Sequence, residues 1–307
     1  MKTKSSPAGG DISLVYSVRL PLSTSTVNHV ASLLRAHRKK IRSRWRTLND
    51  GRIAVIVLAH LRNDERLADL AGGASVSAST VRRWVLEVIG LLAARAPRLD
   101  RALAKVAKDS GCLVLLDGTL IRTRRRTGQA NRKNYSGKHK AHGLLFLALT
   151  DAKGRLLWIS SARRGACSEI TAARYEKLCA RLREFELGAV ADLGFVGLDG
   201  GDSEQPAVIT GFKASGGKRL SSPKKVVNRL ISSLRAPVEH GFASLKTFRI
   251  LTKVRMHPRH ATALVRALLV LTYHQAMPES YVKLPFVKHL TAAVCRGGGP
   301  GERDGPS

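Results

Sequence analysis

The pattern of apolar and polar residues divides the chain into two parts of different character. From Ser23 to about Ala96, apolar residues recur at the spacing of amphipathic helices. Candidate N-caps precede three of these helices: Ser23 or Thr24, Asn49 or Asp50, and Ser77. From Gly111 onward, short apolar runs alternate with turn residues and longer helical patterns, which is typical of an α/β fold. An all-α part is therefore predicted to precede an α/β part.

The α/β part is predicted to form a mixed sheet with flanking helices. Its strands are expected at the short apolar runs, which are residues 111–117, 143–150, 155–160, 188–191 and 208–212. Its helices are expected at residues 169–186, 224–251 and 261–273. A tight turn at residues 151–154 joins the second strand to the third, so the first three strands are expected to form a meander.

Two of the predicted strands end in an aspartate. Asp117 and Asp192 each follow an apolar run and precede a turn. A charged carboxylate on a buried strand costs several kcal/mol unless it is paired or binds a metal ion. Each aspartate, taken alone, could simply cap a turn, as Asp117 could with Gly118 and Thr119. A functional role therefore requires partners from elsewhere in the chain.

A third acid, Glu239, lies on the predicted helix at residues 224–251. Val238, Phe242 and Leu245 mark the buried stripe of this helix, so Glu239 is expected close to the protein core. Two carboxylates at strand ends and one on a later helix can converge on a pair of Mg²⁺ ions, which prefer oxygen ligands and also bind phosphate oxygens. Such a pair can assist the cleavage of a phosphodiester.

The charge balance indicates nucleic acid as the partner. Lysine and arginine number 53 against 22 acidic residues, which gives a formal net charge of +31. Each phosphate that a basic residue neutralises releases counterions. A membrane is a weaker candidate, because the longest apolar run, residues 264–273, is interrupted by Arg266 and is far shorter than the roughly 20 residues of a membrane span. The N-terminus has no signal-peptide pattern and the cysteines form no Cys-x-x-Cys pair, so a cytoplasmic protein is expected.

Two segments carry residues that are expected to contact DNA. Residues 64–89 have the pattern of a helix-turn-helix, although the same pattern is compatible with an αα-hairpin in an accessory bundle. The early residues of its second helix would face the major groove: Ser79, Thr80, Arg82 and Arg83. The second segment, residues 122–140, contains no acid and forms a basic tract. Its cations are Arg122, Arg124, Arg125, Arg126, Arg132, Lys133, Lys138 and Lys140.

The order of these blocks resembles a known family. Residues 111–275 are similar to the DDE transposases of bacterial insertion sequences, in the insertion-sequence 5 and Harbinger group of DDE superfamily endonucleases. The resemblance rests on five blocks: Leu115-Leu-Asp-Gly-Thr119, Tyr135-Ser-Gly-Lys-His-Lys-Ala-His-Gly143, Gly154-Arg-Leu-Leu-Trp-Ile-Ser160, Asp192-Leu-Gly-Phe195 and Leu234-Arg-Ala-Pro-Val-Glu-His-Gly-Phe-Ala-Ser-Leu-Lys246. The helix-turn-helix pattern also resembles the one that precedes the nuclease domain in this family.

The resemblance implies a specific site and reaction. It implies an RNase H-like fold for the α/β part, with Asp117, Asp192 and Glu239 as a catalytic triad that binds two Mg²⁺ or Mn²⁺ ions. The implied reaction is cleavage of double-stranded DNA at the terminal inverted repeats of a transposon, followed by strand transfer to target DNA. Three residues on the helix of Glu239 are expected to support the triad or to contact DNA: Arg235, His240 and Lys246.

Two departures from the family pattern bear on activity. The second acid usually stands in an Asp-Lys-Gly-Tyr context, whereas Leu193 and Phe195 replace the lysine and the tyrosine here, which is expected to weaken DNA contacts. The family block Gly-Ser-x-His-Asp reads Gly165-Ala-Cys-Ser-Glu169. Glu169 could act either as an acid at the start of a helix or as a residue of the active site.

These observations predict a domain organisation and a function. We expect a tail at residues 1–10, a helical DNA-binding domain at 11–105, an RNase H-like DDE catalytic domain at 106–290 and a tail at 291–307. The expected function is that of a metal-dependent DNA transposase of the bacterial cytoplasm, associated with the nucleoid and dimeric in its active complex. The alternatives are a catalytically impaired or regulatory DNA-binding protein derived from a transposase, and a basic RNA-associated structural protein.

Overall fold

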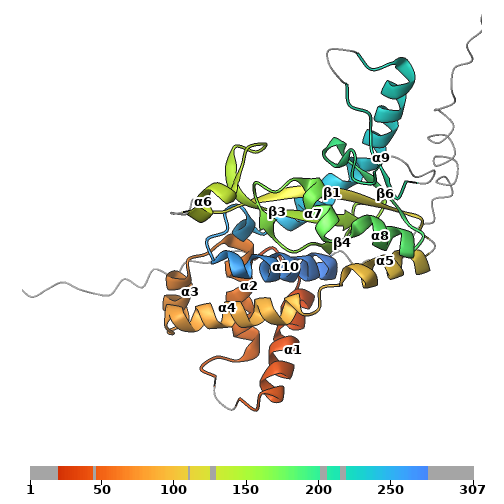
Figure 1. The fold of residues 1–307 in the computed structure, drawn as a ribbon. Helices are drawn as coiled ribbons and strands as arrows, with labels where there is room; N and C mark the ends of the chain where they lie inside the picture. The colour runs from red at the N-terminus through yellow and green to blue at the C-terminus, as the bar shows by residue number, and fades with distance from the viewer. Residues whose placement is uncertain are drawn as a thin grey trace, which may run out of the picture.

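A computed structural model describes most of the chain (Figure 1). The described residues are 20–43, 46–109, 111–124, 129–200, 206–214 and 219–275. The predicted tails and two of the predicted DNA contacts, Arg125 and Arg126, lie outside these ranges.

The N-terminal part is helical, as the apolar pattern predicted. Its first four helices are α1 (Thr24–Lys40), α2 (Asp50–Asn63), α3 (Leu67–Gly73) and α4 (Ala78–Ala93). Three predicted N-caps are confirmed, because the side chains of Ser23, Asn49 and Ser77 each accept a hydrogen bond from a backbone N–H in the first turn. Helix α4 buries its apolar stripe, which includes Val81 and Trp84, against the neighbouring helices.

The C-terminal part contains the predicted mixed sheet. Its main strands are β1 (Leu113–Arg122), β3 (Ala141–Thr150), β4 (Leu156–Ile159), β6 (Gly188–Ala191) and β7 (Val208–Ile209). Two short strands, β2 (Tyr135–Ser136) and β5 (Arg163–Arg164), also pair with β3. Strand β3 is antiparallel to β1 and β4, whereas β6 is parallel to β1 and β7. The predicted opening meander is therefore confirmed.

Helices cover both faces of the sheet. One face packs on α9 (Ser222–Lys246) and α10 (Ala261–Gln275), and the same apolar core continues into α1–α4. The other face packs on α5 (Leu99–Lys108), α7 (Glu169–Tyr175) and α8 (Leu178–Glu184). Helix α10 lies between β4 and α4 (Figure 1), so the helical part and the sheet are joined by packing as well as by the chain.

Four short helices complete the described structure, and three of them are single 3₁₀ turns. They include α6 (Gln129–Lys133) in the basic tract, and the single 3₁₀ turns η1 (Leu193–Phe195) and η3 (Pro258–His260). A further 3₁₀ turn, η2 (Arg249–Leu251), follows α9. Among the helices described, none is long and apolar enough to cross a membrane.

Three details of the predicted elements were wrong. The strand at Asp117 does not end there, because β1 stays paired with β3 from Leu115 to Arg122. The helix expected at 169–186 is two helices, α7 and α8, separated at Lys177, whose φ of 54° is left-handed. Helix α5 lies beyond the helical pattern recognised in the sequence, and it packs on the sheet rather than on α1–α4.

Two glycines allow α9 to pack closely against the turn between β3 and β4. Gly154 has a φ of +77°, and a Cβ there would overlap the carbonyl oxygen of Pro237 in α9. A Cβ on Gly241, one turn farther along α9, would lie 2.5 Å from the carbonyl oxygen of Gly154. The helix backbone thus packs directly on the turn, which fixes where the rest of α9 meets the sheet.

Candidate active site

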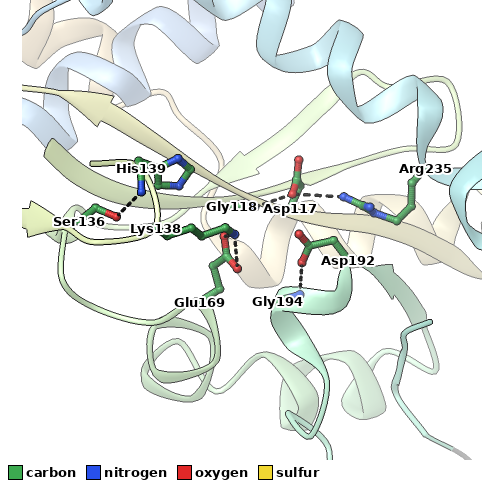
Figure 2. Close-up of polar contacts among 9 residues, drawn as sticks. All are labelled: Asp117, Gly118, Ser136, Lys138, His139, Glu169, Asp192, Gly194 and Arg235. Atoms are coloured by element: carbon green, nitrogen blue, oxygen red, sulfur yellow. Dashed lines mark hydrogen bonds and ion pairs between the residues drawn. The ribbon is translucent and has the colours of Figure 1, made fainter. Parts of the chain in front are cut away.

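The two strand-borne aspartates lie side by side at the end of a parallel strand pair. The β1–β6 pairing ends at Leu116 and Ala191, and the residue that follows each of these two in the chain is an aspartate. Figure 2 shows the side chains of Asp117 and Asp192 next to each other. The carboxyl ends of parallel strands are where α/β proteins commonly place functional groups. The register of one strand pair therefore unites two acids that are far apart in sequence.

Each aspartate also has a local structural role. Asp117 Oδ1 accepts a hydrogen bond from the backbone N–H of Gly118 at 2.9 Å and lies 3.3 Å from Nη2 of Arg235. Asp192 Oδ1 accepts a hydrogen bond from the backbone N–H of Gly194 at 2.8 Å and so caps η1. A carboxylate has two oxygens and several lone pairs, so capping and metal binding are compatible.

The acids form an electrostatically unfavourable group. The pKa of Asp117 is raised to about 6, first by burial, with further upward contributions from the negative charges of Asp192 and Glu169. The nearby guanidinium of Arg235 and the N–H of Gly118 act in the opposite direction without cancelling the rise. A bound divalent cation would relieve this repulsion.

The donor set of this group suits a hard divalent cation. Carboxylate oxygens are the ligands that Mg²⁺ and Mn²⁺ prefer. Within the described ranges, however, no three His, Cys, Asp or Glu side chains are grouped closely enough to hold an ion. Two cations, Arg235 and Lys138, pair with the acids instead. The structure thus provides two adjacent carboxylates, with cations paired to the acid group.

Glu169 belongs to the same acid group. It is the first residue of α7, but the N-cap hydrogen bond is made by Ser168, whose hydroxyl accepts from the N–H of Thr171. The Glu169 carboxylate is buried, and a Cβ on either Gly118 or Gly194 would collide with its oxygens. It therefore lies against the backbone directly beside both aspartates, as Figure 2 also shows.

Glu239 lies on α9, one helical turn from Arg235, and it is not among the acids whose charges act on Asp117. Arg235, one turn earlier, contacts Asp117, while Phe242 and Lys246, on the following turns, line a pocket with residues 118–122. Glu239 is exposed, contrary to the expectation that it lies close to the core, because α9 turns Val238, Phe242 and Leu245 inward instead. In the described part of the chain it has no hydrogen-bond or ion-pair partner.

The pocket continues the site along β1. Its volume is about 560 Å³, and His139 and Leu251 add to its lining. Its wall on β1 begins just beyond the point where the β1–β6 pairing ends at Leu116, and the backbone N–H of Val254 donates to the carbonyl of Arg122 at the far end of the strand. The cavity has both apolar and cationic walls, and it begins at Gly118, the residue that follows Asp117.

The predicted DNA contacts are exposed wherever the structure describes them, with one exception. The exposed residues are Ser79, Arg82 and Arg83 on α4, Arg122, Arg124, Arg132, Lys133, Lys138 and Lys140 in the tract, and Lys246 on α9. The exception is Thr80, which is half-buried and accepts a hydrogen bond from Arg83. His240 is exposed beside Glu239.

The structure also brings together basic residues that the sequence did not link. Arg82 of α4 lies close enough to η3 to lower the pKa of His260, after the larger contributions of burial, Arg259 and His257. A second basic concavity at the end of α1 is lined by Arg35, Arg38, Lys39, Arg42 and Ser43. Arg82 and His260 are far apart in the sequence, so no local pattern could have revealed that their charges interact.

The two departures beside Asp192 have different surroundings. Leu193 is 41% exposed, so the position of the family lysine faces solvent. Phe195 is 0% exposed and packs in the core between the sheet and α7–α8. The ring of Phe195 therefore does not reach the surface, and the effect of the missing tyrosine hydroxyl on DNA contacts stays a prediction.

The chain matches known proteins over the region that contains these acids. A family model described as DDE superfamily endonuclease matches residues 116–273. A protein of Streptomyces albus G assigned as a transposase for insertion sequence element IS112 is 29% identical over 205 residues, which are 66% of this chain and 71% of that one. A solved structure of the Mos1 transposase paired-end complex with the left transposon end is 10% identical and covers 75% of this chain and 96% of that chain, but its TM-score of 0.19 is too low to support a structural argument.

The matched region includes the two aspartates, Glu169 and Glu239, together with the strands and helices that carry them. It spans just over half of the 307-residue chain. The resemblance identified from the sequence motifs is confirmed. The chain belongs to the DDE superfamily endonucleases, with the transposases of bacterial insertion sequences.

Proposed function

We propose that this protein cuts DNA at the ends of a mobile element and joins them to target DNA, with Asp117, Asp192 and Glu239 as ligands of Mg²⁺ or Mn²⁺. The observation that carries the proposal is the adjacency of Asp117 and Asp192 where the β1–β6 pairing ends. When bound, two such ions activate the attacking oxygen and stabilise the leaving oxygen of a phosphodiester.

The position of Glu239 supports its role as the third ligand. It stands between Arg235, which contacts Asp117, and Phe242, which lines the adjoining pocket. Its exposed carboxylate can approach an ion without the cost of breaking an existing pair. Lys246 and Arg122 at the pocket would hold the DNA backbone beside the acids.

The strand order supports an RNase H-like core. Three antiparallel strands, β4, β3 and β1, are followed by two parallel strands, β6 and β7. The acids lie on the central strand and directly after its parallel neighbour. This arrangement agrees with the fold that the family resemblance implies.

The helical part would position the DNA. In the proposed organisation, residues 11–105 form a DNA-binding domain, and residues 106–290 form the catalytic domain. Helices α3 and α4 would place Ser79, Arg82 and Arg83 against the major groove, and the basic tract would contact the backbone. Two copies of the chain would be needed to hold both ends of the element.

A second function is favoured by one observation. Leu193 faces solvent where the family carries a lysine, so a cation beside the second acid is missing. The loss of this cation would be expected in a transposase-derived protein that binds DNA without cutting it. It would bind DNA in a salt-sensitive manner and show no cleavage with any divalent ion.

Cleavage of DNA carrying the terminal repeats of the element tests the proposal. The purified wild-type protein is expected to nick this DNA with Mg²⁺ or Mn²⁺, and Asp117→Asn is expected to abolish nicking while DNA binding persists. Glu184→Gln is the matched control, since Glu184 is an exposed acid on α8 that pairs with Arg181. Equal nicking by Asp117→Asn and wild type would rule out the assignment, and binding without nicking by the wild type would favour the second function.

A further inference from the structure

One cation of the basic tract is already engaged by an acid. Lys138 lies in the turn between β2 and β3, where the Ser136 hydroxyl accepts a hydrogen bond from the N–H of His139. Its ammonium group donates to both carboxylate oxygens of Glu169, at 2.9 and 3.1 Å (Figure 2). The Lys138 side chain is 59% exposed, whereas that of Glu169 is 9% exposed. An accessible cation thus holds a buried acid.

The other described cations of the tract differ from Lys138 in this respect. They have no acid partner within the described part of the chain, and they are Arg122, Arg124, Arg132, Lys133 and Lys140. DNA that binds along the tract would therefore meet one cation that must leave an existing partner. That partner lies in the active site.

Lys138 interacts electrostatically with both aspartates as well as with Glu169. Although burial acts to lower its pKa, the net shift is upward, because of its hydrogen bonds to Glu169 and the charges of Glu169, Asp192 and Asp117. Glu169, for its part, touches the backbone beside both aspartates, at Gly118 and Gly194. Release of Lys138 would therefore leave Glu169 as an unpaired carboxylate next to Asp117 and Asp192.

We propose that Glu169 is a further acid of the metal site and that Lys138 controls its availability. In the free protein Lys138 pairs with Glu169, and on binding DNA it moves to a backbone phosphate. Glu169 then adds its charge to the site and favours the divalent cation. This inference rests on the proposed function, since it requires that Asp117 and Asp192 bind the metal.

The exchange of partners makes DNA binding and metal binding cooperative. A phosphate replaces Glu169 as the partner of Lys138, and the metal replaces Lys138 as the partner of Glu169. By linkage, DNA that tightens metal binding must itself be bound more tightly when the metal is present. Removal of the Lys138 charge should therefore reproduce part of the effect of DNA on metal affinity.

The affinity of the full-length protein for Mn²⁺ alone tests this inference without DNA and without cleavage. Free Mn²⁺ is followed by electron paramagnetic resonance during titration. Lys138→Met is expected to tighten Mn²⁺ binding by about three- to tenfold, which corresponds to a modest coupling energy. Glu169→Gln is expected to weaken it. The matched control is Lys140→Met, an exposed lysine of the same turn, which is expected to leave Mn²⁺ affinity unchanged.

The double variant distinguishes a specific pair from a general charge effect. In the Glu169→Gln background, Lys138→Met is expected to have a much smaller effect on Mn²⁺ affinity, because only the charges of Asp117 and Asp192 then remain to act on Lys138. An equal effect with and without Glu169, or no difference between the Lys138 and Lys140 variants, would overturn the inference. Mn²⁺ binding that does not depend on Asp117 would overturn the proposed function itself, so the two failures are distinguishable. Circular dichroism of each variant confirms that it is folded.

Discussion

The acid group at the end of the β1–β6 pairing and the helix pair α3–α4 carry charge in opposite surroundings. Asp117 and Glu169 are both held close to the backbone at Gly118, and the negative charge of Glu169 contributes to the raised pKa of Asp117. Arg82 and Arg83 stand on the exposed side of α4, whose opposite side is packed in the core. The acid group depends on the relative placement of three segments, which are β1, the end of β6 and the start of α7, whereas the second group depends on a single helix.

This difference determines how each region should respond to substitution. At the acid group, a change in one side chain alters the balance among several charges, so effects are expected to be coupled. On α4, each exposed side chain acts separately, so effects are expected to be small and additive. Backbone changes should also matter at the acid group, because α9 reaches it through a close helix–turn contact.

The largest effect is expected where α9 packs on the turn between β3 and β4. Gly241→Ala should lower the free energy of unfolding by about 1–3 kcal/mol, because the added methyl group has no room beside Gly154. The matched change on the other region is Gly90→Ala in α4, where a Cβ would meet open space. Gly90→Ala should raise the free energy of unfolding by up to about 1 kcal/mol, because alanine favours the helix more than glycine does. Urea unfolding measures both, and equal effects would remove the proposed difference between the regions.

A smaller and separate effect is expected on α4. Arg82→Ala should weaken DNA binding by about tenfold, with no change in thermal stability. It should also reduce the slope of log affinity against log salt concentration by about one, which corresponds to the loss of one phosphate contact. The control is Arg95→Ala, because Arg95 is exposed near the other end of the same helix and bonds to its own turn. Fluorescence anisotropy at several salt concentrations measures the effect. Equal losses in the two variants would contradict a groove-facing role for the start of α4.

The sequence reveals features that depend on neighbouring residues. Ser23, Asn49 and Ser77 were recognisable as caps because a short polar side chain preceded an apolar helical pattern. Asp117 and Asp192 were recognisable because each interrupts an apolar run. Such signals are local, so they predicted the helix caps and most of the elements, and they singled out the two aspartates that the structure places next to each other.

Features that depend on tertiary contacts could not be predicted in the same way. The pairs Lys138–Glu169 and Arg235–Asp117 join segments that are 31 and 118 residues apart, and no spacing rule links them. The break at Lys177 places a non-glycine residue at positive φ, so the usual glycine signal was absent. Helical periodicity gave the face of Glu239 but not its exposure, because exposure depends on how α9 meets the sheet.

The position of bound Mn²⁺ tests the central claim most directly. A crystal of the wild-type protein grown with Mn²⁺ and measured for anomalous scattering locates the ion independently of activity. The claim predicts Mn²⁺ coordinated by Asp117 and Asp192, with Glu239 as a further ligand. Mn²⁺ bound away from these two aspartates, or no ordered Mn²⁺ at saturating concentration, would contradict it.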